Sequence, residues 1–67
     1  MIELIKLNDQ AIVLNSDLIE YIEATPDTMI TMTTGRKLVV KDKVDEVVRK
    51  VIEYRRSIYE GLAIKPQ

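Results

Sequence analysis

The side chains best suited to recognition chemistry in this 67-residue chain form two small clusters. The first cluster lies near the C-terminal end and consists of Tyr54, Arg55, Arg56 and Tyr59. Tyrosine and arginine are enriched at the energetic centres of protein interfaces, because they combine contact area with directional polar bonds. We therefore treat these four residues as a candidate partner interface. The alternative interpretation is a solvated helix end whose arginines complement the helix dipole.

The second cluster is basic and consists of Arg36, Lys37, Lys41 and Lys43. Cations at this density are a candidate site for nucleic acid, because they attract phosphate groups. The pI of about 5.3 is acidic, however, and the chain has no Trp or Phe on which a base could stack. We favour the interpretation that these charges protect an edge strand from aggregation. Nucleic-acid binding is the alternative.

The composition excludes several classes of enzyme. The chain has no histidine and no cysteine, so no imidazole can activate a nucleophile, and the usual zinc ligands and disulfides are absent. The only glycines are Gly35 and Gly61, which rules out a glycine-rich phosphate loop. We therefore expect no catalytic residues, no metal site, no cofactor and no enzymatic activity.

The charge is unevenly distributed along the chain. Residues 1–35 hold one cation and six anions, whereas residues 36–67 hold nine cations and five anions. Such asymmetry indicates a nucleic-acid partner, a membrane partner or mutual attraction of the two halves. We favour attraction between the halves, within one chain or across a subunit interface.

The length predicts one small domain, residues 1–60, followed by a short tail, residues 61–67. Val, Ile and Leu supply 22 residues, enough for a hydrophobic core. A domain of this size often needs self-association for stability, so we expect a homo-oligomer. No apolar run is long enough to span a bilayer, and the N-terminus lacks the features of a signal peptide. These features predict a cytoplasmic protein without a transmembrane segment.

The two clusters must be positioned by short strands and one helix. Polar turns at residues 8–10 and at Thr34-Gly35 separate β-rich segments, and Gly35 supplies the positive φ that a tight hairpin needs. The predicted strands are residues 2–7, 11–14, 20–25, 28–33 and 36–40.

Apolar residues from Val44 onwards recur with helical spacing, which predicts an amphipathic helix. Asp42 is the predicted N-cap and Gly61 the predicted stop. The fold class is α+β: a small antiparallel β-meander of four or five strands, followed by one C-terminal amphipathic helix that covers a face of the sheet. We favour the interpretation that this apolar stripe packs on the sheet. The alternative is that the stripe is wider than one small sheet can cover, in which case the excess is a candidate interface.

Three motifs carry a resemblance to a known family. They are E-A-T-P-D-T at residues 23–28, T-G-R-K at residues 34–37 and V-D-E-V-V at residues 44–48. Together with the segments around them, they resemble the small flagellar FlbD family of Gram-positive bacteria, the SwrD-like swarming proteins. The resemblance covers nearly the whole chain. Thr34 departs from the usual Asn before the glycine, which affects only the chemistry of the turn.

The resemblance implies an accessory role in flagellar motility or swarming. In this role the protein supports the power of the flagellar motor, and the stator is one candidate route for that effect. It implies no catalytic residues. We therefore expect a non-enzymatic cytoplasmic protein that acts through protein–protein contacts at the flagellar motor, on the inner face of the membrane. The alternative is a small nucleic-acid-binding regulator of flagellar gene expression, which uses the basic hairpin and the helix start.

Overall fold

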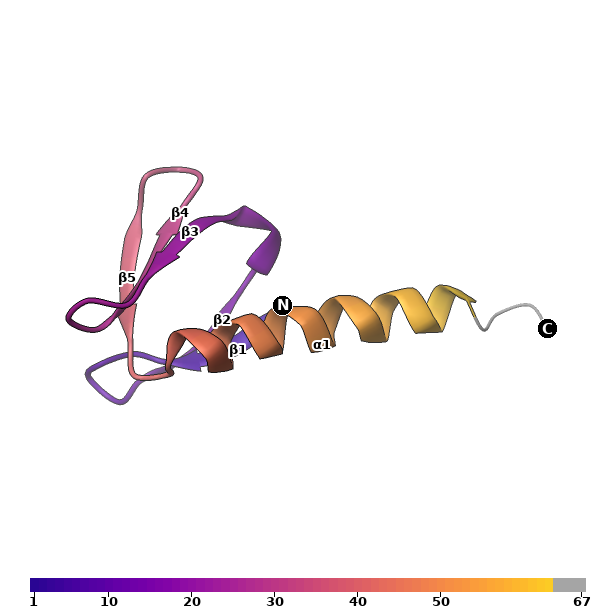
Figure 1. The fold of residues 1–67 in the computed structure, drawn as a ribbon, viewed down its shortest axis with the longest axis horizontal. Coiled ribbons are helices and arrows are strands. Elements are labelled where there is room, and N and C mark those ends of the chain that lie inside the picture. Colours follow the sequence, from indigo (N-terminus) through magenta and orange to yellow (C-terminus); the bar gives the residue numbers. More distant parts are fainter. Residues whose placement is uncertain (64–67) are drawn as a thin grey trace.

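The computed structural model describes the backbone of residues 1–63 and the side chains of residues 1–59. Five strands are followed by one long helix, which confirms the predicted α+β class (Figure 1). In chain order the elements are β1 (Ile2–Ile5), β2 (Ala11–Leu14), the 3₁₀-turn η1 (Ser16–Leu18), β3 (Ile19–Glu23), β4 (Thr28–Met32), β5 (Lys37–Val40) and α1 (Val44–Ala63).

The strands form two antiparallel sheets, where the sequence predicted a single meander. One sheet is the β1–β2 hairpin, and the other is the meander β3–β4–β5. The chain turns away from the hairpin at η1, where the Asn15 side chain accepts a hydrogen bond from the Asp17 N–H, so β2 and β3 do not pair. The two sheets meet where Lys6 bridges Val40 and the Lys41 N–H donates to the Ile5 carbonyl at 2.7 Å.

Two turns hold the hairpins in register. Asp9 has a φ of 68°, and the Asn8 side chain accepts the Gln10 N–H at 3.0 Å. Gly35 has a φ of 92°, which is the positive value predicted for the β4–β5 hairpin. Glycine adopts such left-handed conformations without strain, and aspartate, like asparagine, tolerates them better than most residues. Between β3 and β4, the Thr25–Pro26 peptide bond is cis.

Both sheets and the helix contribute to the hydrophobic core. Its buried members are Ile2, Leu4, Ile30, Met32, Val40 and Val47. Burial of one such side chain stabilises the fold by about 1.5–3 kcal/mol. The predicted alternation in β4 places Ile30 and Met32 on the core face, and both are buried. Thr31 faces the opposite side and is buried as well, since Tyr21 and Lys37 flank it on the neighbouring strands.

The start of α1 corrects one prediction. Asp42 is not the N-cap: α1 begins at Val44, and the Glu46 carboxylate accepts a hydrogen bond from the Lys43 N–H at 2.8 Å. This contact is half of a capping box, with Lys43 in the N-cap position. The helix also continues past Gly61 to Ala63, so the predicted stop at Gly61 is wrong. The rest of the predicted tail, residues 64–67, lies outside the described residues.

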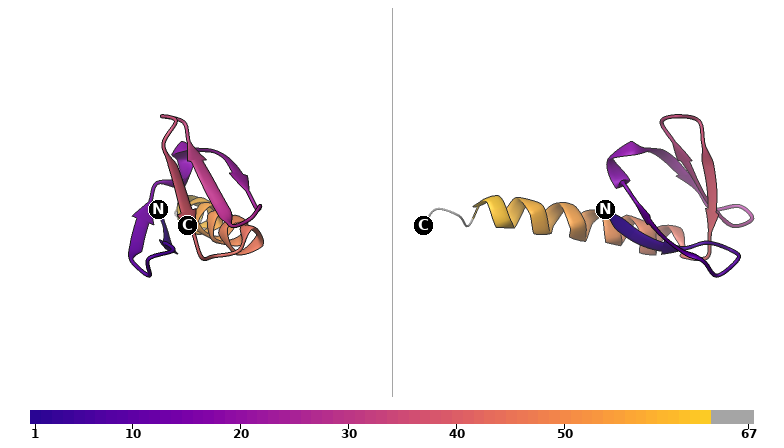
Figure 2. Two further views of the ribbon diagram at one scale, coloured as in Figure 1. Left: turned by 90° about the vertical axis from the view of Figure 1, so that its left-hand side faces the viewer. Right: turned by 180° about the vertical axis from the view of Figure 1, so that it is seen from behind.

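The molecule is elongated, measuring 47 × 23 × 18 Å, because α1 extends well beyond the strands (Figures 1 and 2). The N-terminal half of the helix packs against β1, and Val51 and Tyr54 reach the core. All five residues from 55 to 59 are exposed. We call residues 55–63 of α1 the overhang. The strands thus cover only part of the helix, which leaves a stretch of α1 available for other contacts.

Candidate functional site

The helix α1 carries two apolar stripes. The inner stripe of Val47, Val51 and Tyr54 packs against the core. The outer stripe of Val48, Ile52 and Tyr59 is exposed. At about 100° per residue, the outer stripe lies about 110° around the helix axis from the inner one. The apolar surface of the helix is therefore wider than the strands cover, which was the alternative interpretation of the sequence.

A surface groove of about 610 Å³ runs along the exposed side of α1 where the overhang begins. We call it the interface groove. Its lining residues are Asp17, Ile52, Tyr54, Arg55, Arg56, Ile58 and Tyr59. The structure thus brings together all four candidate interface residues of the sequence and adds two isoleucines and an aspartate to them. The grouping follows from helical spacing, because residues three and four apart share a face.

Asp17 joins the interface groove from a different part of the chain. The Arg55 Nη2 atom lies 2.7 Å from the Asp17 Oδ1 atom, which connects η1 to α1. Both side chains are largely exposed, so this ion pair contributes at most about 1 kcal/mol to stability. Its effect is mainly geometric, since it fixes the arginine along one wall of the groove. No local motif marks Asp17 in the sequence, although the opposite charges of the two halves of the chain indicated pairs of this kind.

The exposed apolar side chains of the groove are unusual for a solvent-facing surface. Ile52 and Ile58 are 50% and 46% exposed, and Tyr59 is 73% exposed. Arg55 and Arg56 border them. An apolar centre with tyrosine and arginine around it is the composition of a protein-binding hot spot.

The four cations of the predicted basic patch do not form one surface. Arg36 and Lys37 line a groove with Lys6 at the start of β5, whereas Lys41 and Lys43 line another groove beyond its end. An extended chain rises about 3.3 Å per residue, so the two pairs are separated by roughly the length of β5.

The second pair of cations is further balanced by acidic groups. Lys41 forms an ion pair with Asp9, and its groove also contains Asp27 and Asp45. The local positive potential is therefore weaker than the sequence cluster indicated.

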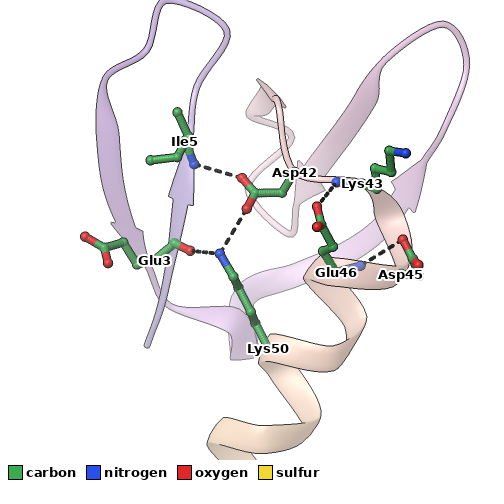
Figure 3. A network of polar contacts seen from close by, with 7 residues as sticks. All are labelled: Glu3, Ile5, Asp42, Lys43, Asp45, Glu46 and Lys50. Atoms are coloured by element: carbon green, nitrogen blue, oxygen red, sulfur yellow. Dashed lines mark hydrogen bonds and ion pairs between the residues drawn. The ribbon is translucent and has the colours of Figure 1, made fainter.

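A partly buried polar contact holds α1 against the hairpin (Figure 3). The Asp42 Oδ1 atom accepts the Ile5 N–H at 2.9 Å, and its Oδ2 atom accepts a bond from Lys50 Nζ at 2.9 Å. Lys50 also donates to the Glu3 carbonyl at 2.7 Å. The two side chains thereby occupy hydrogen-bonding groups on the edge of β1 that faces away from β2. This contact fixes the direction in which α1 leaves the strands.

The pKa of Asp42 reflects these contacts. Partial burial raises it, but the hydrogen bonds from the Ile5 N–H and from Lys50, together with the charge of Lys50, have the greater effect. They hold the pKa of the Asp42 carboxyl below its ordinary value. Asp42 is therefore a structural carboxylate that stays ionised at neutral pH.

Comparison with known protein families yields one match. The model of FlbD, described as flagellar and swarming motility proteins, matches residues 1–59. The chain belongs to the FlbD family. The match confirms the resemblance found in the sequence and associates this FlbD chain with flagellar and swarming motility. Neither the curated proteins nor the solved structures that were compared contain a match.

The FlbD match spans the whole strand region and α1 as far as Tyr59, so it includes every residue of the interface groove. Among the described side chains, those of residues 1–59, no three from His, Cys, Asp and Glu gather in a way that could hold a metal ion. In this FlbD chain α1, the helix of residues 44–63, is not apolar enough to cross a membrane.

Proposed function

We propose that the chain is a non-enzymatic accessory protein of flagellar and swarming motility, which binds a protein partner through the interface groove. The single observation that carries the proposal is the exposed apolar centre of the groove, where Ile52, Ile58 and Tyr59 lie beside two arginines. Family membership supports the motility role.

The overhang makes the groove accessible to a large partner. Because α1 extends beyond the strands, a second helix or a flat protein surface can approach without meeting the sheets (Figure 1). An apolar helix face of this kind is typical of helix-in-groove and helix–helix recognition. We propose that the partner is a component of the flagellar motor, and the stator is one candidate. Binding occurs on the cytoplasmic side, and its effect is to support motor power.

The first experiment is a gene deletion with microscopy of the flagella. We expect swarming to fall while the filaments remain assembled and transcripts of flagellar genes stay at their normal level. Loss of all filaments would contradict a role in motor power. A general loss of flagellar transcripts would favour the alternative, a regulator that binds nucleic acid.

The second experiment tests the groove itself by complementation of the deletion strain. A Tyr59→Ala, Ile52→Asp double variant is expected not to restore swarming, because it removes the largest exposed ring and places a charge in the apolar centre. The matched control is Glu53→Gln, a change on the solvated face of the same helix, where among the described side chains Glu53 forms an ion pair with Arg49 alone. Full swarming with the double variant, at normal protein level, would refute the proposed binding site.

A further inference from the structure

The two sheets, joined at the Lys6–Val40 bridge, end in two open strand edges. At the junction, the outer edge of β5 is occupied by residues 5–7, since Lys41 donates to the Ile5 carbonyl and the Leu7 N–H approaches the Val39 carbonyl at 3.4 Å. Within the described residues, the remaining free edges are those of β2 and β3. In Figure 2 the β1–β2 hairpin lies at the periphery of the molecule.

These two edges differ in their protection against pairing with another strand. The edge of β3 carries Glu20 and Glu23, and its register shifts between Ile19 and Tyr21. Charges and irregular register are the usual means by which proteins block an edge. The strand β2, Ala11–Leu14, has no charge, no proline and a regular register. Its edge therefore has neither of these two blocks.

The backbone groups on the free edge of β2 can be assigned from the hairpin register. The Lys6 N–H donates to the Gln10 carbonyl at 2.9 Å, so the bonds within the hairpin fall on even-numbered residues. The N–H and C=O groups of Ala11 and Val13 consequently point away from β1. Val13 is also 69% exposed, the highest value of any large hydrophobic residue in the strands. An apolar, uncharged strand thus presents two donors and two acceptors to solvent.

We infer that β2 pairs with the β2 strand of a second copy of this chain, antiparallel and across a two-fold axis. The axis passes through Ile12, so that Ala11 of each copy lies opposite Val13 of the other. Each of these two pairs exchanges two backbone hydrogen bonds, which makes four bonds for a strand of four residues. The half-buried side chains of Ile12 and Leu14 then extend the inner apolar face from one copy into the next.

Strand length favours this register, and backbone pairing favours this occupant. In the chosen register, the small Ala11 faces the larger Val13, and both residues lie within β2. A shift that placed Val13 opposite Val13 would put Ala11 opposite Asn15, which lies beyond the end of β2 and caps η1. A second copy in the chosen register therefore satisfies the free groups of β2 symmetrically. The inference does not depend on the interface groove, which lies on α1.

The test is the oligomeric state of the full chain, measured by sedimentation equilibrium over a wide range of concentration. We expect a concentration-dependent dimer. Val13→Pro removes one outward N–H per copy but no bond within the hairpin, and proline is tolerated at edge positions. Loss of two bonds is expected to raise the dimer dissociation constant about 30-fold. Val13→Lys, which keeps the N–H but adds a charge to the edge, should weaken the dimer as well.

The matched control is Val13→Thr, which keeps the N–H and the β-branched shape and should leave the dimer intact. Far-UV circular dichroism checks that each variant is folded. If Val13→Pro does not fold, the dimer dissociation constant of Val13→Lys is the test of the inference. A wild-type chain that stays monomeric up to about 1 mM would overturn the inference. A dimer unaffected by Val13→Lys would overturn it too.

Cross-linking tests the register, because the natural chain has no cysteine. Chains with Ala11→Cys are mixed with chains carrying Val13→Cys. A mixed disulfide is expected to form in preference, since opposed Cα atoms in a hydrogen-bonded pair lie about 5.5 Å apart, within the range of a disulfide. A Val13→Cys chain that links to itself in preference would overturn the register.

Discussion

Lys50 Nζ lies 2.9 Å from the Asp42 Oδ2 atom, although the two residues come from α1 and from the loop before it. The Asp42 side chain is only 11% exposed, so the pair is shielded from water much more than the other ion pairs of the described chain. Since Asp42 also accepts the Ile5 N–H, one carboxylate connects the first strand, the β5–α1 loop and the helix. The direction of α1 relative to the strands depends on this contact.

Replacement of this carboxylate should therefore destabilise the protein. We expect Asp42→Asn to lower the free energy of unfolding by about 1–3 kcal/mol, because the amide group places a donor against Lys50 and removes the charge. Urea denaturation measures the change. Asp27→Asn, at an exposed loop position, is the control and should have little effect. Equal losses for the two variants would contradict the role assigned to Asp42.

The same carboxylate should contribute to the acid sensitivity of the fold. Its pKa is lower in the folded protein than in the unfolded chain, where an aspartate has a pKa of about 3.9. The stability that it contributes is fully present above that value and is lost as the pH falls through the folded pKa. We expect the free energy of unfolding to fall more steeply below about pH 4 in the wild type than in Asp42→Asn. Parallel pH profiles would show that Asp42 does not contribute.

Substitution of two isoleucines, one in the core and one in the proposed binding site, should have very different effects on stability. Ile30 is fully buried, so Ile30→Ala should cost about 2–5 kcal/mol, which approaches the total stability of a domain this small. Ile52 is half exposed, so Ile52→Ala should change stability by no more than about 0.5 kcal/mol. Thermal unfolding measures both. If Ile52→Ala proved as costly as Ile30→Ala, the outer stripe of α1 would belong to the core.

The separation of the basic residues predicts weak interaction with nucleic acid. Arg36 and Lys37 lie at one end of β5, and Lys41 beyond the other end is paired with Asp9. We expect no measurable binding of DNA or RNA in a fluorescence anisotropy titration at low salt, where electrostatic binding is strongest. Salt-dependent binding that an Arg36→Gln, Lys37→Gln variant abolished would revive the alternative of a nucleic-acid-binding regulator.

Local chemistry made much of this structure predictable. The turn at Gly35 requires a positive φ, and the helix follows from its apolar spacing, so both could be placed from a few neighbouring residues. The four interface residues lie together for the same reason, since they share consecutive turns of one helix. The four residues of the basic patch lie in two separate places, because cations that are close in sequence move apart when the chain between them is extended.

Contacts between distant parts of the chain were not predictable. Asp42 has the residue type and the position of an N-cap, but Ile5, 37 residues earlier, binds its carboxylate instead. The pairing of Asp17 with Arg55 spans 38 residues and depends on how η1 is folded against the helix. The division into two sheets likewise depends on the junction of Lys6 with Val40. No local pattern contains this information.

The overhang of α1 has a consequence for the folding equilibrium of the helix itself. From residue 55 onwards, the described side chains of the helix have no core to hold them, and a free helical segment shorter than about 12–15 residues is marginal in water. This part of α1 can therefore open while the strands remain intact, and its amides should exchange with deuterium faster than those near Val47. A protein that binds the interface groove would slow this exchange by stabilising the last turns of the helix. Binding at the proposed site would therefore be coupled to local helix formation.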